Sequence, residues 1–187
     1  MPTRAMSSME LKELYDRKAS AMTRRPAFAR GVGQARVHMG FGLACDVRYE
    51  DGMGRVDQPE SEGGTATGPH PGQLMRASLG ACLAMGYRLW AARLGTQIDA
   101  VDVEIVCEYD ARGQMGVTPE IAVGWQRISF NVVVVSPATE DDVRRVVETA
   151  DRLSPMLANL SPSVERSHRL TIVASRARDT TTTGVEW

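Results

Sequence analysis

The chain has few cysteines, no excess of either charge and no long apolar run. Three cysteines, an odd count without regular spacing, predict no disulfide framework, and a reducing cytoplasm is the expected compartment. The net charge of −1 argues against nucleic acid and against an anionic membrane surface as partners. The longest apolar run, residues 77–87, is too short to span a bilayer, and residues 1–30 contain no apolar signal segment.

Histidine is also sparse, and the common ligand-binding motifs are missing. His38, His70 and His168 are dispersed and show no metal-binding spacing, so we expect no metal site. Residues 63–68, GGTATG, lack the Gly-Lys-Ser/Thr ending of a phosphate-binding loop, and residues 31–36, GVGQAR, lack the third glycine of a dinucleotide fingerprint. The sequence therefore predicts no cofactor.

Hydrophobic periodicity predicts an α+β fold with one main domain. Helices are expected over 8–22, 71–95 and 139–153, and strands over 34–38, 43–49, 54–58, 99–110, 125–135 and 169–174. Residues 59–72, with four glycines and three prolines, are expected to form a loop. We expect an N-terminal helical extension over 1–30, the main domain over 31–175 and a flexible tail over 176–187.

Cys82 is the most informative residue, because it lies near the middle of a long apolar helix that directly follows the glycine-rich loop. Its helical neighbours are mostly apolar, which disfavours a thiolate, so a reactive Cys82 needs a cation from elsewhere in the fold. From the residues alone, core packing is favoured over chemistry. Cys45 and Cys107 lie on the apolar faces of predicted strands, where packing is the better interpretation.

Residues 60–95, ESEGGTATGPHPGQLMRASLGACLAMGYRLWAARLG, resemble the OsmC/Ohr family, named for osmotically inducible protein C and organic hydroperoxide resistance protein. Its members share a Gly-Gly loop, a Pro followed by an L-x-x-x-S/A-x-x-x-C helix, and then a charged strand. The order of elements is similar from about residue 31 to residue 174. The resemblance implies an intertwined homodimer in which antiparallel sheets wrap around two central helices, with sites at the subunit interface.

The resemblance also implies a thiol peroxidase that reduces organic hydroperoxides. In the family, the helix cysteine becomes a sulfenic acid, a second cysteine before a Pro forms a disulfide with it, and a dithiol reduces that disulfide. Cys82 matches the first cysteine, whereas Ser154, followed by Pro155, stands at the position of the second. A hydroxyl cannot form a disulfide. Ser154 is also a good N-cap for a short helix at 155–160.

The family further uses an arginine from the N-terminal strands and a glutamate from the glycine loop to activate the first cysteine. The matching residues would be Arg30 or Arg36 and Glu60 or Glu62, and the alternative for all four is solvated surface charge. A guanidinium suits this role because it stays charged and can hydrogen-bond a thiolate and a peroxide oxygen together. The apolar pocket expected beside Cys82 would be lined by Met75, Leu79, Met85 and Trp90.

Two functions follow from these residues. The first is a one-cysteine peroxidase in oxidative stress defence, in which Cys82 is reduced again by an external thiol, or by Cys45 or Cys107 if either lies close. The second is a non-catalytic protein of the same fold that binds an apolar small molecule at the dimer interface. A purely structural dimer with an inert Cys82 is a third possibility.

Overall fold

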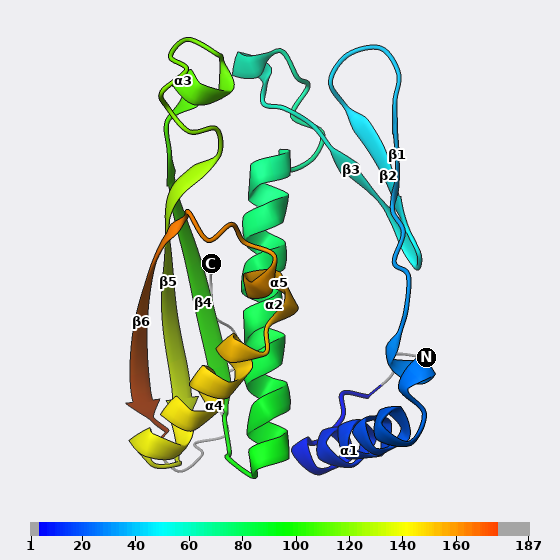
Figure 1. Ribbon diagram of the computed structural model, residues 1–187, viewed down its shortest axis with the longest axis vertical. Helices are drawn as coiled ribbons and strands as arrows, with labels where there is room; N and C mark the ends of the chain where they lie inside the picture. Colours follow the sequence, from blue (N-terminus) through cyan, green and yellow to red (C-terminus); the bar gives the residue numbers. More distant parts are fainter. Residues whose placement is uncertain (1–3, 176–187) are drawn as a thin grey trace. The chain divides into compact units, whose positions relative to one another are not determined.

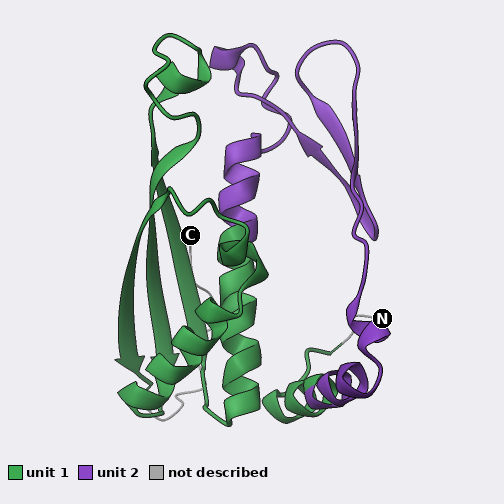
Figure 2. Ribbon diagram, in the orientation of Figure 1, with its two compact units in different colours: residues 1–15, 79–187 green, residues 16–78 purple. Residues whose placement is uncertain are grey.

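The computed structural model describes residues 4–175, which divide into two units (Figure 2). Unit 1 combines Met1–Tyr15 with Leu79–Trp187, and unit 2 is Asp16–Ser78. The predicted tail at 176–187 lies outside the described residues. Across the described part of the chain, no helix combines the length and the apolar character that a membrane span requires.

Unit 1 is built on a three-stranded sheet in the order β4-β5-β6, with bounds Ala100–Tyr109, Trp125–Ser136 and Glu165–Ala174 (Figure 1). β4 and β5 are antiparallel, but β5 and β6 are parallel. The expected antiparallel pairing is therefore present between β4 and β5, and β6 adds a parallel strand to this sheet. Parallel neighbours need a long crossover connection, and here it is provided by α4, Glu140–Arg152, and α5, Pro155–Ala158.

The core of unit 1 lies between this sheet and two helices, α4 and the part of α2 (Pro71–Leu94) that belongs to the unit. Alternate residues of β5 are buried, as expected for a strand with one covered face. The helices contribute residues at helical spacing to the same cluster. The main members of the core are Leu79, Leu83, Tyr87, Ala91, Ile128, Phe130, Val132, Val134, Val143, Val146, Val147 and Ala150.

The connection between β5 and β6 follows the sequence prediction except at its end. Thr139, at the predicted start of this helix, is the N-cap of α4 and accepts a hydrogen bond from the backbone N–H of Asp142 at 3.2 Å. Leu153, the last residue of the helix predicted over 139–153, is 52% exposed, because α4 ends at Arg152. β6 begins at Glu165, four residues before the predicted start at residue 169, since its first residues are polar and show no alternation.

Unit 2 contains a small antiparallel sheet in the order β1-β2-β3, with bounds Arg36–Met39, Cys45–Tyr49 and Gly52–Val56. A tight turn at Glu50 and Asp51 joins β2 to β3. Within β2 only Val47 is buried; Cys45, expected on the apolar face, is half-buried, and Tyr49 is exposed. Two short 3-10 helices that the sequence did not predict, η1 at Pro26–Ala29 and η2 at Glu60–Glu62, flank the sheet in the chain.

Two further helices begin at residues whose side chains cap the helix N-terminus. α1 spans Ser8–Arg24, and its N-terminus is closed by Ser7 and Glu10, whose side chains each accept a hydrogen bond from the other's backbone N–H. α3, Ala111–Gln114, was not predicted; Asp110 is its N-cap. The side chain of Arg112 also pairs with Asp110, and these contacts lower the pKa of the Asp110 carboxyl to about 2.

Candidate functional site: the Cys82 helix and its surroundings

The glycine-rich loop before α2 is organised around one buried carboxylate. Asp57 follows β3 directly, is only 2% exposed, and accepts five hydrogen bonds from the loop. The backbone N–H and hydroxyl groups of Thr65 and Thr67 donate four of them, at 2.7–3.1 Å, and the backbone N–H of Gln58 donates the fifth at 2.8 Å. These donors, led by the Thr65 hydroxyl, hold the pKa of Asp57 well below its usual range.

Two glycines let this loop lie directly against the chain that precedes it. A Cβ on Gly64 would meet the carbonyl oxygen of Gln58 at 1.9 Å, and one on Gly68 would meet that of Arg55 at 2.3 Å. Both neighbours are backbone atoms, so no side-chain movement could relieve the contact. The loop composition is therefore explained by close backbone packing within unit 2.

The start of α2 is closed by a histidine in place of the usual Ser or Thr. His70 Nδ1 accepts a hydrogen bond from the backbone N–H of Gly72 at 3.1 Å. The side-chain oxygen of Gln73 accepts in return from the backbone N–H of His70 at 3.0 Å. Pro71 occupies the first helical position, where a missing N–H costs nothing. His70 is therefore accounted for by helix capping.

Cys82 lies on α2 within unit 1 and is half-buried. Its Sγ lies 3.8 Å from the Oγ of Ser154, which is 6% exposed. Ser154 is also the N-cap of α5, as predicted, and its Oγ accepts a hydrogen bond from the backbone N–H of Leu157 at 3.3 Å. The structure thus brings together the two residues that the family resemblance pairs, as a thiol and a hydroxyl.

The Cys82–Ser154 contact is one of three contacts between α2 and the segment formed by α4 and the start of α5. A Cβ on Gly86 would lie 3.7 Å from the Cβ of Ala150, so the two backbones approach closely there. One residue further along each helix, the hydroxyl of Tyr87 donates a hydrogen bond to Asp151 Oδ1 at 2.8 Å. Small residues at the crossing therefore let polar contacts form on both sides of it.

Tyr87, Asp151 and His168 form a polar cluster that runs from the buried Tyr87 through the half-buried Asp151 to the exposed His168. Tyr87 is fully buried, and burial together with the adjacent Asp151 raises the pKa of its phenol far above the usual range. Burial also raises the pKa of Asp151, against the opposing effects of the Tyr87 hydrogen bond and of His168. His168 Nδ1 lies 3.7 Å from Asp151 Oδ2, which is an ion-pair distance but too long for a hydrogen bond.

The charged residues proposed from the family resemblance all belong to unit 2. Arg30 directly follows η1 and Arg36 begins β1 opposite Arg48, and both are exposed. Glu60 and Glu62 are the first and last residues of η2, and both are exposed. Because Cys82 belongs to unit 1, the approach of any of these charges to the thiol stays a prediction.

The four residues expected to line an apolar pocket have different environments. Leu79 is buried in the core of unit 1, whereas Met85 is 67% exposed. Trp90 is partly buried, with the guanidinium carbon of Arg93 4.5 Å from its ring centre. Met75 belongs to unit 2 and is exposed. None of the four lines either of the two cavities of unit 1 described next.

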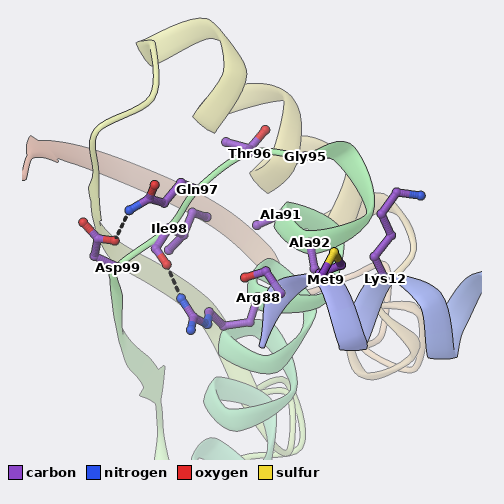
Figure 3. A pocket seen from close by; sticks show the side chains of 11 residues that line it. Met9, Lys12, Arg88, Ala91, Ala92, Gly95, Thr96, Gln97, Ile98 and Asp99 are labelled. Carbon is purple, nitrogen blue, oxygen red and sulfur yellow. Dashed lines mark hydrogen bonds between the residues drawn. The ribbon is translucent and has the colours of Figure 1, made fainter. Parts of the chain in front are cut away.

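Unit 1 contains a cavity of about 720 Å³ at the C-terminal end of α2 and a cavity of about 180 Å³ beside Asp151. Figure 3 shows the larger one, where Arg88 donates to the carbonyl oxygen of Ile98 and Gln97 donates to Asp99. The smaller cavity has mixed apolar and polar walls; its lining residues are Leu83, Tyr87, Phe130, Asp151, Leu157, Arg166, Ser167 and His168.

The remaining cysteines and histidines offer no alternative centre among the described residues. Cys45 and Cys107 are half-buried, and none of the three cysteines forms a disulfide. Within residues 4–175, no group of His, Cys, Asp and Glu side chains could hold a metal ion.

Sequence reasoning missed Asp57, Tyr87 and Asp151. Asp57 carried a usable signal, because an Asp between a strand and a Thr- and Gly-rich loop is well placed to accept backbone hydrogen bonds. Tyr87 and Asp151 carried none, since their pairing depends on how two helices distant in sequence pack together.

Comparison with known proteins agrees with this architecture. The chain is similar in structure to an OsmC-like protein from Mycoplasma pneumoniae, with a TM-score of 0.66 and 14% identity over 76% of this chain and 98% of that one. It is similar to an organic hydroperoxide resistance protein OsmC from Legionella pneumophila, with a TM-score of 0.56 and 19% identity over 76% and 97% of the two chains.

A third similar structure is an OsmC-like protein of unknown function from Vibrio cholerae, with a TM-score of 0.60 and 10% identity over 75% of this chain and 100% of that one. At these identities the likeness shows the fold alone. No curated protein has a sequence that matches this chain. The family model described as OsmC-like protein matches residues 63–168, more than half of the chain, and includes both Cys82 and Ser154. The chain therefore belongs to the OsmC-like protein family.

Proposed function

We propose that the protein reduces organic hydroperoxides through Cys82 and that an external thiol then regenerates Cys82. The observation that carries this proposal is the 3.8 Å contact between the Cys82 sulfur and the Ser154 hydroxyl. It supports a site in which the first cysteine of the family pair is kept and the second is replaced by a group that cannot form a disulfide. The name of the Legionella relative, an organic hydroperoxide resistance protein, supports the same class of substrate.

The first step oxidises the cysteine and reduces the peroxide. The Cys82 thiolate attacks one peroxide oxygen, a sulfur–oxygen bond forms and the oxygen–oxygen bond breaks. The alkoxide takes up a proton and leaves as an alcohol, and Cys82 becomes a sulfenic acid. An arginine, Arg30 or Arg36, held by Glu60 or Glu62, would stabilise the thiolate and the leaving oxygen, as the family resemblance implies.

The second step needs a thiol from outside the chain, because Ser154 cannot condense with the sulfenic acid. An external thiol attacks the Cys82 sulfur and releases water, which leaves a mixed disulfide. A second thiol then attacks this bond, so that Cys82 returns to the thiol form and the two external sulfurs are joined. Each turnover thus consumes one hydroperoxide and two thiols.

The proposal is tested by mass spectrometry after one equivalent of cumene hydroperoxide, with dimedone present to trap sulfenic acid. We expect a dimedone adduct on Cys82 in the wild-type chain and none in Cys82→Ser, with Cys45 and Cys107 as internal comparators. Ser154→Cys provides a matched two-cysteine control, in which a disulfide between Cys82 and the introduced cysteine replaces the adduct. If Cys82 stays a free thiol while the Ser154→Cys variant is oxidised, the one-cysteine mechanism is wrong.

A non-catalytic function is the second candidate. The Cys82 sulfur lies 3.8 Å from the neutral hydroxyl of Ser154, and a neutral partner stabilises a thiolate less than a cation does, which favours a protein that keeps the fold without the chemistry. Such a protein would bind an apolar small molecule at a dimer interface. Wild type and Cys82→Ser would then bind an alkyl ligand equally well in calorimetry, and neither would consume hydroperoxide.

We also propose that the protein is a homodimer. Large apolar side chains of unit 1, including Met85, Val106 and Leu153, are exposed in the single chain, as expected for surfaces that a second copy covers. Size-exclusion chromatography with light scattering should give twice the chain mass of 20.4 kDa. A mass of one chain at micromolar concentration would contradict this.

A further inference from the structure

We propose that Tyr87 and Asp151 are positioning residues, which hold Ser154 against Cys82 by fixing the end of α4 to α2. They touch neither the sulfur nor a substrate, and they act through residue 154. Their importance for turnover rests on the function proposed above. Their effect on the Cys82–Ser154 geometry does not, and it can be measured without any peroxide.

The strongest contact in this arrangement is the hydrogen bond from Tyr87 to Asp151. Tyr87 is fully buried and belongs to the middle of α2, so its hydroxyl is a fixed point. Asp151 lies in the last turn of α4, and its Oδ1 accepts from that hydroxyl at 2.8 Å. A buried hydrogen bond to a carboxylate is stronger than one between neutral groups, and losing one partner leaves the other unsatisfied.

The last turn of α4 connects Asp151 directly to Ser154. The backbone N–H of Ser154 donates to the carbonyl oxygen of Asp151 at 3.2 Å, so the two residues are joined directly. Ser154 then begins α5 through its hydrogen bond with Leu157. The anchored carboxylate and the hydroxyl at Cys82 thus lie within one helical turn of each other along the chain, and therefore a shift of Asp151 moves Ser154 as well.

A third element holds Asp151 from the opposite side. His168 on β6 places Nδ1 3.7 Å from Asp151 Oδ2, and its ring packs edge-on against Phe130 at a centroid distance of 6.3 Å. The 180 Å³ cavity borders the same three polar side chains, so the end of α4 has free space on this side and is not fixed there by close packing alone. The hydrogen bond to Tyr87 is thus the contact that sets its position.

The experiment measures the reduction potential of the disulfide between Cys82 and the introduced cysteine in the full-length Ser154→Cys variant. This potential reports how closely residue 154 is held to Cys82. The 3.8 Å contact predicts that Cys82 and the introduced cysteine oxidise to a disulfide in a glutathione buffer, once the two sulfurs close to about 2.05 Å. Adding Tyr87→Phe removes the hydroxyl, and we expect the effective concentration of the two thiols to fall about tenfold. That change corresponds to a potential about 30 mV less negative.

The control variants separate positioning from general stability. Asp151→Ala should match Tyr87→Phe, whereas Asp151→Asn keeps an oxygen that accepts from Tyr87 and should stay within about threefold of the parent. Val132→Ala opens the core of unit 1 without touching the cluster, so it should lower the melting temperature and leave the potential unchanged.

Two results for the reduction potential would overturn the proposal: an unchanged potential in Tyr87→Phe and Asp151→Ala, or an equal change in Val132→Ala. Failure of Ser154→Cys to form the disulfide would also overturn it, because residue 154 would then not be held at Cys82 in solution. An inert Cys82 in the wild-type peroxide assay, with the expected shifts in potential, would reject the proposed function alone.

Discussion

Gly86 offers a direct test of the close approach between α2 and α4. A Cβ at this position would lie 3.7 Å from the Cβ of Ala150, which is ordinary van der Waals contact. Alanine is favoured over glycine inside a helix by about 0.8–1.0 kcal/mol. Gly86→Ala should therefore raise the free energy of unfolding by about 1 kcal/mol, which corresponds to an increase in melting temperature of roughly 2–4 °C.

A larger side chain at the same position should have the opposite effect. Leucine needs volume that the Ala150 side chain and its backbone occupy, and overpacking of this kind costs about 1–3 kcal/mol. The helices can relieve the contact only by moving apart, and this movement would carry Ser154 away from Cys82. In the Ser154→Cys background, Gly86→Leu should therefore also prevent Cys82 from forming a disulfide with the introduced cysteine.

The assays are urea unfolding followed by far-UV circular dichroism and thiol counting after oxidation with glutathione. Ala81→Leu adds the same side chain at an exposed position of α2 and should leave the disulfide intact. A destabilisation of more than about 1 kcal/mol by Gly86→Ala would contradict the 3.7 Å spacing, since it would mean that the helices lie closer. An intact disulfide in Gly86→Leu would refute the close approach itself.

Two predictions concern carboxylates whose pKa values the fold shifts in opposite directions. Burial raises the pKa of Asp151, so the ionised group costs stability at neutral pH; Asp151→Asn should stabilise the fold at pH 7, and urea titrations should show this advantage fading as the pH falls through the raised pKa towards the ordinary value of about 4. A difference independent of pH would contradict the burial argument. The pKa of Asp57 is lowered, so its stabilising effect should be complete at neutral pH and disappear as the pH falls through the acid range; Asp57→Asn should unfold more easily than wild type at pH 7 and approach it in acid. Equal stabilities at pH 7 would show that the loop does not depend on this carboxylate.

The parts of the fold that the sequence predicted well are those where one face of an element is buried. The alternation in β4 and β5 and the stripe of α4 record the core directly, so the bounds predicted for these elements differ from the structure by a single residue at most of their ends. The first half of β6 is polar and exposed, and its place in the sheet depends on pairing with β5 from Arg127 onward. Strand pairing of this kind leaves no periodic signal in the strand itself.

In the candidate site, too, the residues that belong to local motifs could be predicted and those that depend on tertiary packing could not. Cys82 could be found from the loop and helix around it, and Ser154 from the family pattern, because both belong to local motifs. The Tyr87–Asp151 contact could not, since it depends on which turn of α2 meets which turn of α4. The small residues Gly86 and Ala150 let the two helices approach closely at the crossing point, and no local pattern in either helix specifies which turns meet there.

Ser154 keeps the structural role of its position in the family fold while removing the disulfide that the family resemblance implies. Position 154 has two requirements: it must begin α5, and in two-cysteine relatives it must also form a disulfide. Serine satisfies the first better than cysteine does, because its hydroxyl is a stronger hydrogen-bond acceptor for the Leu157 N–H. It fails the second completely. The structural role of the residue is thus retained next to Cys82. Under the proposed function, an external thiol regenerates Cys82, so turnover of the wild type should depend on thiol concentration. The first turnover of Ser154→Cys, which ends in a disulfide, should not depend on it.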